Sequence, residues 1–175
     1  MKEKALKIIK SKYFIGTILT IILYFVYLAI AKISPFGENS ILKSDLYKQY
    51  AEFLAYYKDV LTGKDSLFMS WNMGMGNNFY TTFAYYLVSP LNLLVVFFSK
   101  ENINTFVIIT TLLKLILIYN SMILFLEYRF KDKSKSAILF ALAYTFSTYT
   151  IQYLFHIMWL DAIYMLPLMC IGVEK

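Results

Sequence analysis

Long apolar stretches without charge alternate with short charged segments along the chain. The first stretch, residues 13–31, lies between Lys12 and Lys32 and is close to the roughly 20 residues that a bilayer crossing needs. A secretory signal peptide is the alternative, with Ala29-Ile30-Ala31 as its cleavage site. The stretch is longer than the apolar core of a signal peptide, which has about 7–15 residues. The pattern therefore favours an uncleaved membrane anchor.

Three further apolar segments, 103–127, 136–155 and 158–173, are predicted to cross the membrane. Residues 66–99 also carry no charge, but Ser89-Pro90 interrupts their apolar tract. Proline removes a backbone donor and disfavours helix at the residue before it. Residues 79–98 therefore form either a span or a re-entrant or interfacial pair of short helices.

The placement of basic residues decides between these alternatives. One basic tract contains Lys2, Lys4, Lys7, Lys10 and Lys12, and the other contains Arg129, Lys131, Lys133 and Lys135. Cytoplasmic loops of membrane proteins carry an excess of Lys and Arg, and both tracts lie inside only if 79–98 does not span. The predicted order is a cytoplasmic tract 1–12, span 13–31, external loop 32–102, span 103–127, cytoplasmic loop 128–135, span 136–155 and span 158–173. The fold class is all-α, with residues 1–175 as a single membrane domain of about four spans and interfacial helices in the first external loop.

Composition supports a membrane location and excludes other classes. The chain is 59% hydrophobic and 16% charged, whereas a soluble domain has about 45–50% apolar and about 25% charged residues. Such a sequence is neither disordered nor a cytosolic enzyme. The net charge of +6 comes from tracts that flank apolar segments, so the predicted partners are membrane lipids and not nucleic acid. One cysteine and one histidine exclude a disulfide framework and a Cys- or His-rich metal site.

The external loop contains a predicted amphipathic helix from Ser44 to Thr62. Ser44 suits the N-cap, Asp45 complements the helix dipole, and Gly63 suits the stop. Apolar positions recur at helical spacing, and the helix is expected to lie on the bilayer surface or against other helices. Further along, the Gly74 and Gly76 loop resembles a phosphate-binding nest, although a tight turn is the simpler interpretation.

Four ionisable residues are candidates for function, because charge near the bilayer interior is costly. Asp45, His156 and Asp161 fall on the external side in the predicted topology, and Lys114 lies near the middle of a span. A carboxylate at this face could take a proton from an attacking hydroxyl or hold a cation against a phosphate. Each of the four residues also has a purely structural interpretation. Asp45 could cap a helix, Asp161 could begin a helix at the interface, and His156 could be an interfacial polar residue. Lys114 could pair with a carboxylate elsewhere in the bundle and serve only packing.

Several motifs, taken in order, resemble the N-terminal portion of the YfhO family of bacterial membrane proteins. They are Ser44-Asp45-Leu46-Tyr47-Lys48-Gln49-Tyr50, Gly74-Met75-Gly76-Asn77-Asn78, Tyr85-Tyr86-Leu87-Val88-Ser89-Pro90-Leu91-Asn92-Leu93-Leu94, Thr111-Leu112-Leu113-Lys114 and Ile157-Met158-Trp159-Leu160-Asp161-Ala162. That family is similar to GT-C glycosyltransferases of the bacterial plasma membrane. The resemblance implies a multi-pass protein that takes a sugar from a polyprenyl-phosphate donor and modifies a cell-surface polymer such as teichoic acid.

The resemblance also implies roles for individual residues. Asp45 matches the catalytic or metal-linked aspartate of the first external loop, and Asp161 matches a second external acidic position. Lys114 matches a lysine without an assigned role and is included, with His156, among the substrate-binding candidates. In the glycosyl-transfer hypothesis Lys43 or Lys48 neutralises the donor phosphate, and Asp45 either acts as a base towards the acceptor hydroxyl or helps to hold a divalent cation.

Members of that family are several times longer than this chain. We therefore expect this sequence to lack the regions that complete the donor pocket and bind the acceptor, as a truncated gene, one part of a split protein or a fragment. A missing C-terminal part would be a partner, and independent catalysis is not expected. The alternative functions are a lipid or small-solute transporter fragment and a non-catalytic membrane assembly subunit.

Overall fold

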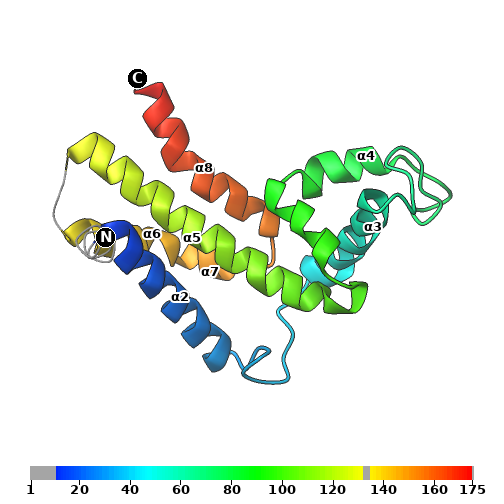
Figure 1. The fold of residues 1–175 in the computed structure, drawn as a ribbon, viewed down its shortest axis with the longest axis horizontal. Helices are drawn as coiled ribbons and strands as arrows, with labels where there is room; N and C mark the ends of the chain where they lie inside the picture. The colour runs from blue at the N-terminus through cyan, green and yellow to red at the C-terminus, as the bar shows by residue number, and fades with distance from the viewer. Residues whose placement is uncertain (1–10, 132–134, 175) are drawn as a thin grey trace, which may run out of the picture. The chain divides into compact units, whose positions relative to one another are not determined.

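The computed structural model describes residues 11–131 and 135–174, and the regular elements within them are helices joined by loops (Figure 1). These residues contain two isolated β-bridges and no strand. The elements are α2 (Lys12–Ile30), η1 (Leu46–Tyr50), α3 (Ala51–Leu61), α4 (Phe79–Thr82), η2 (Phe83–Leu87), η3 (Pro90–Phe97), η4 (Lys100–Asn102), α5 (Ile103–Phe130), α6 (Ser136–Thr145), α7 (Thr148–Gln152) and α8 (Ile157–Val173). The all-α prediction is confirmed. The basic tract 1–10 and Lys133 lie outside the described residues.

The chain divides into two compact units. Unit 1 contains residues 1–39, 111–154 and 159–175, and unit 2 contains residues 40–110 and 155–158. The sequence prediction of one membrane domain did not anticipate this division. Each unit is described by itself below.

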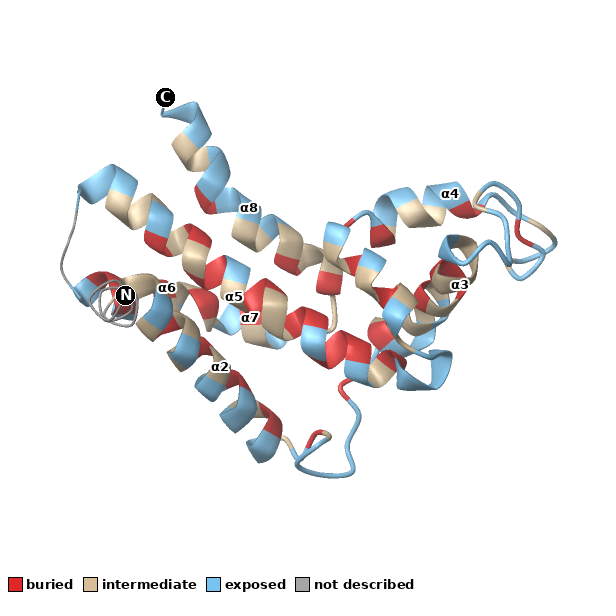
Figure 2. Ribbon diagram, viewed as in Figure 1, coloured by how far each residue is buried: buried red, intermediate tan, exposed pale blue. Residues whose placement is uncertain are grey.

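Helix α2 has the surface of a helix that faces lipid. Ser11 caps its start by accepting a hydrogen bond from the Phe14 amide at 3.1 Å. Its buried residues recur every fourth position, which places them in one narrow stripe (Figure 2). Large apolar side chains on the remaining faces are exposed: Phe14, Ile18, Ile22, Leu23, Phe25, Val26 and Ile30. Lipid tails are the medium in which such a surface is stable.

Two helices, α2 and Lys100–Phe130 (η4 with α5), are long and apolar enough to cross a membrane, and a third span results if the bent pair described below is counted as one. The predictions of helical spans at 13–31 and 103–127 agree with this. The segment 136–155 differs, because it is divided into α6 and α7 at Phe146. At about 1.5 Å per residue α6 alone is too short to cross about 30 Å of hydrocarbon. The 17-residue helix α8 is apolar but shorter than the two long helices.

The core of unit 1 forms where α2, α5 and α6 meet. Its buried members come from α5 and α6, and partly buried side chains of α2 pack against them. The buried residues are Tyr119, Ile123, Ala137, Ile138 and Ala141. At the end of α2, Lys12 Nζ pairs with Glu127 at 2.8 Å, and the hydroxyl of Tyr13 donates to the same carboxylate at 2.7 Å. The Tyr119 hydroxyl donates to the Lys12 carbonyl at 2.9 Å, so α2 and α5 are joined by polar bonds as well as packing.

In unit 2, η1 and α3 form the amphipathic helix that the sequence predicts. Its C-terminus is as expected: Gly63 has a φ of +73°, and the amides of Gly63 and Lys64 bond back to the carbonyls of Val60 and Asp59, which is a Schellman motif. At the N-terminus, Ser44 lies directly before the helix with a left-handed φ of +49°, and its carbonyl accepts the amides of Tyr47 and Lys48. The N-cap residue of η1 is Asp45.

The tract 79–98 is bent at the position that the sequence indicated. Phe79–Leu87 and Pro90–Phe97 lie at 110° to each other. Ser89 has a φ of −54° and a ψ of 128°, which is outside the helical region that a following proline disfavours. Buried Asn92 donates its side-chain amide to the Leu87 carbonyl at 3.1 Å, which bonds one arm of the bend to the other.

Candidate functional site

Asp45 lies at the point where the first helix of unit 2 begins. Although it occupies the N-cap position, its backbone is already helical and its side chain makes no capping hydrogen bond. An N-cap normally uses its side-chain oxygen to bind a free amide of the first turn. The interpretation of Asp45 as a simple helix cap is therefore wrong, and its carboxylate is left for another role.

His156 brings an imidazole to this carboxylate. His156 Nε2 lies 3.9 Å from Asp45 Oδ2, with the histidine side chain 18% exposed and the aspartate side chain 42% exposed. The His156 ring also packs against Phe155, with the ring centroids 4.3 Å apart. The two groups form an ion pair when the imidazole is protonated. A half-exposed carboxylate beside a mostly buried imidazole can accept a proton from a hydroxyl and pass it on.

Lys114 and Asp161 form a second charged pair, which lies in unit 1. The Lys114 ammonium on α5 donates to Asp161 Oδ2 on α8 at 2.7 Å. The lysine side chain is 1% exposed and the aspartate side chain 21% exposed. An ammonium buried this deeply is stable only with a counter-charge. The prediction that Lys114 pairs with a carboxylate is confirmed, and the carboxylate is another candidate residue.

The positions of Lys43, Lys48 and Asp161 bear on the roles predicted for them. Lys43 and Lys48 are exposed on unit 2, as is required of cations that could meet a phosphate from solution. Asp161 is the fifth residue of α8, so the interpretation of Asp161 as an interfacial helix start is wrong. The structure thus pairs Asp45 with His156 and Lys114 with Asp161, and it describes these pairs in different units.

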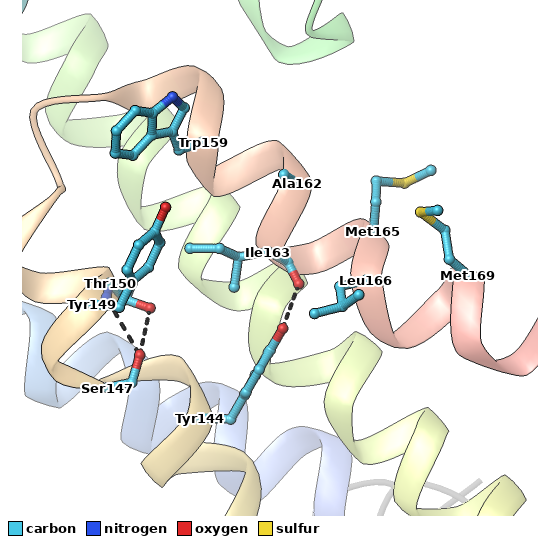
Figure 3. Close-up of a pocket in the computed structure, with 10 residues that line it drawn as sticks. All are labelled: Tyr144, Ser147, Tyr149, Thr150, Trp159, Ala162, Ile163, Met165, Leu166 and Met169. Carbon is cyan, nitrogen blue, oxygen red and sulfur yellow. Dashed lines mark hydrogen bonds between the residues drawn. The ribbon is translucent and has the colours of Figure 1, made fainter.

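Unit 1 also contains an apolar cavity of about 620 Å³ (Figure 3). Its lining residues come from the α6–α7 segment and from one face of α8: Tyr144, Ser147, Tyr149, Thr150, Trp159, Ala162, Ile163, Met165, Leu166 and Met169. Three of the hydroxyls in this lining bond within it. Ser147 and Thr150 are 3.0 Å apart, and the Tyr144 hydroxyl donates to the Ile163 carbonyl at 2.9 Å. The cavity therefore offers a mostly hydrocarbon surface on which these three hydroxyls are already hydrogen-bonded.

Sequence reasoning missed the cavity and the role of Asn92. The cavity depends on the break between α6 and α7, where Ser147 accepts a hydrogen bond from the Thr150 amide and begins the second helix. The hydroxyl-rich string Thr145-Phe146-Ser147-Thr148 was a usable signal, because Ser and Thr compete with helical hydrogen bonding. Asn92 was quoted as part of a motif, but its structural role follows only from its bond across the bend.

The described residues do not make a metal site from protein groups alone. Within residues 11–131 and 135–174, no three His, Cys, Asp or Glu side chains cluster closely enough to hold an ion. Asp45 and His156 supply two groups, and a cation held against a phosphate needs further ligands. We therefore derive no step of the chemistry through a metal.

The fold and these pairs define an all-helical membrane protein with ionisable groups placed among apolar helices. The sequence matches the family described as "Bacterial membrane protein YfhO" over residues 16–175. The chain therefore belongs to the YfhO family of bacterial membrane proteins. Comparison with curated proteins and with solved structures gave no match.

Proposed function

We propose that this chain is a GT-C-like glycosyltransferase module that uses a polyprenyl-phosphate-linked sugar to glycosylate a cell-surface polymer such as teichoic acid. Membership of the YfhO family supports the membrane setting. The observation that carries the proposal is the Asp45 carboxylate, which makes no cap and lies 3.9 Å from His156. A carboxylate released from capping and placed beside an imidazole is suited to acid–base chemistry.

In the proposed reaction the acceptor hydroxyl attacks the anomeric carbon of the donor sugar. The new bond joins the acceptor oxygen to that carbon, and the bond from the carbon to the phosphate oxygen breaks. The proton of the hydroxyl passes to Asp45, and polyprenyl phosphate leaves with its negative charge. Lys43 or Lys48, both exposed, neutralises the leaving phosphate, and His156 orients the Asp45 carboxylate.

The apolar cavity of unit 1 supports the same proposal for the donor lipid. Its size falls in the range of about 300–1,000 Å³ that is typical of ligand sites, and its mostly apolar lining suits a hydrocarbon chain. Asp161 is proposed as the second acidic group, and its carboxylate lies 2.7 Å from the Lys114 ammonium. This assignment requires Asp45 and Asp161 to serve one face of the membrane.

Replacing Asp45 with asparagine is expected to reduce transfer of sugar to the surface polymer by about 100- to 10,000-fold, the usual contribution of a general base. The measurement is the sugar content of the polymer in cells that carry the variant at the native protein level. Glu52→Gln is the matched control, because Glu52 is an exposed carboxylate on α3 without a proposed role. Undiminished glycosylation with Asp45→Asn would remove Asp45 from the mechanism.

Topology gives an independent prediction. In a Cys170→Ser background, which removes the one native cysteine, a cysteine at residue 60 is expected to react with a membrane-impermeant maleimide in intact cells. A cysteine at residue 132 is expected to react only after the membrane is permeabilised, because the basic tract is predicted to be cytoplasmic. Reaction of both positions from outside would contradict the predicted topology and separate Asp45 from Asp161.

Two observations favour a second candidate function, a fragment of a lipid or small-solute transporter. Transporters place ion pairs and discontinuous helices at mid-depth, and this chain has the Lys114–Asp161 pair and the 110° bend. Uptake or flipping of a labelled lipid that depends on Lys114, together with unaltered polymer glycosylation, would favour this function over the transferase.

A further inference from the structure

The loop between α3 and α4 exposes large apolar side chains. Phe68 is 69% exposed, Trp71 76% and Met75 98%, and Figure 2 shows most of this loop as exposed. From residue 66 to residue 99 the sequence contains no charged residue. Surface loops are usually polar, and a cluster of exposed aromatic and methionine side chains marks an interaction surface. We refer to residues 66–78 as the aromatic loop.

Hydrogen bonds hold this loop in one conformation. Ser70 and Asn77 exchange two backbone bonds, at 2.8 and 2.9 Å, which close the tip. At the base, the Tyr56 hydroxyl lies within bonding distance of both the Asp65 carboxylate, at 2.9 Å, and the Ser66 carbonyl, at 2.8 Å. Burial raises the pKa of Tyr56, so this hydroxyl keeps its proton and remains a donor at neutral pH.

The tip of the loop requires glycine chiefly for its backbone conformation. Gly76 has a φ of +99°, and a side chain there would come within 2.8 Å of Met69 and 3.0 Å of the Trp71 ring. Gly74 also has a positive φ, of +61°. The turn at the tip of the loop therefore depends on the left-handed backbone that these two glycines adopt.

The exposed surface continues onto the bent pair of helices. The ring of Phe68 stacks on Tyr80, with the centroids 6.2 Å apart, and Tyr80 is the second residue of the arm Phe79–Leu87. Tyr80 and Tyr85 are themselves exposed on this arm. The bent pair of helices is apolar enough to lie in the membrane. The exposed surface that it shares with the loop is therefore expected to face lipid as well.

We propose that the aromatic loop inserts its tip into the headgroup and upper acyl region of the phospholipid bilayer that the protein spans. Trp and Tyr prefer this interface, because their rings are apolar and their N–H and O–H groups remain hydrated. The lack of charge along the loop removes the penalty that a Lys or Asp would add. The inference does not depend on glycosyl transfer, and it makes the loop an anchor that holds α3 at the membrane surface through Tyr56.

The two tryptophans of the chain provide the test. Trp159→Phe leaves Trp71 as the single tryptophan. The whole chain is reconstituted in phosphatidylcholine vesicles, with or without lipid brominated near the top of the acyl chains. We expect brominated lipid to remove about half or more of the Trp71 emission, because interfacial side chains insert about 5–10 Å. Acrylamide in the aqueous phase is expected to quench Trp71 only weakly.

A pair of variants at one position sharpens the test. Met75→Asp is expected to reduce quenching by brominated lipid by about twofold or more, since a carboxylate at the tip opposes insertion. Met75→Leu keeps an apolar side chain and is expected to leave quenching unchanged. If Trp159→Phe does not fold, the Trp71 signal is obtained as the difference between the native chain and Trp71→Phe.

Two results would overturn the proposal. If acrylamide quenches Trp71 as it quenches free tryptophan and brominated lipid has no effect, the loop lies in water. If neither quencher reaches Trp71, protein covers the loop. Neither result depends on Asp45, so failure of the anchor is distinguishable from failure of the transferase proposal.

Discussion

Replacing Asp161 with leucine is expected to destabilise the protein by about 3–5 kcal/mol, the cost of leaving a buried charge without its partner. The Lys114 side chain is 1% exposed, so its ammonium cannot reach bulk water when Asp161 is removed. The measurement is the midpoint of unfolding in a titration with denaturing detergent. A change below about 1 kcal/mol would show that Lys114 finds another counter-charge or is neutral in the folded protein.

Replacing the lysine of this pair is expected to lower the free energy of unfolding by less than replacing the aspartate. Lys114→Met leaves the Asp161 carboxylate, whose side chain is 21% exposed and can be hydrated from its open side, so we expect about 1–3 kcal/mol. The double variant Lys114→Met with Asp161→Leu is expected to recover most of the loss, because apolar residues replace a buried pair at little cost. A double variant with the summed cost of both single changes would show that the two residues act independently.

Gly16→Ala is expected to destabilise the protein by about 2 kcal/mol, although alanine favours helix over glycine by about 1 kcal/mol. A β-carbon at Gly16 would overlap Cζ and Oη of Tyr119. Tyr119 cannot move aside easily, because it is fully buried and its hydroxyl donates to the Lys12 carbonyl at 2.9 Å. The sign of the effect therefore distinguishes close packing of α2 on α5 from helix propensity alone.

Gly172→Ala in α8 is the matched control. A β-carbon at Gly172 has no atom within 4 Å, so the change is expected to be neutral or slightly stabilising. Combining Gly16→Ala with Tyr119→Leu is expected to cost less than the sum of the two single changes, because the shorter side chain removes the overlap. Thermal unfolding in detergent micelles measures all four variants. Equal effects of the changes at Gly16 and Gly172 would contradict the close approach.

Local sequence was sufficient for several features of the fold. The charge-free stretch after Lys12 forms α2, the bend occurs at Ser89-Pro90, and Gly63 ends α3. Each depends on the chemistry of a few neighbouring residues: apolar length, the missing donor of proline, and the left-handed conformation of glycine. The sequence did not predict the division of 136–155 into α6 and α7, where the Ser147 hydroxyl accepts a hydrogen bond from the Thr150 amide and begins a new helix.

The candidate site was predictable as a set of residues but not as a set of pairs. The sequence singled out Asp45, Lys114, His156 and Asp161 because charge is rare in its apolar segments. Which of them meet depends on the rotation of each helix about its axis and on its crossing with a neighbour. A helix that carries apolar residues on every face, as α8 does, gives no local signal of that rotation.

The sequence by itself determined that this is an all-helical membrane protein, because hydrophobic length and charge placement are properties of the linear chain, and its match to the family over residues 16–175 shows that it belongs to the YfhO family. Only the tertiary structure decided that Lys114 meets Asp161, that Asp45 meets His156 without capping its helix, and that Gly16 makes room for Tyr119. These contacts join residues far apart in the chain, and packing selects them through the shapes and charges of facing surfaces.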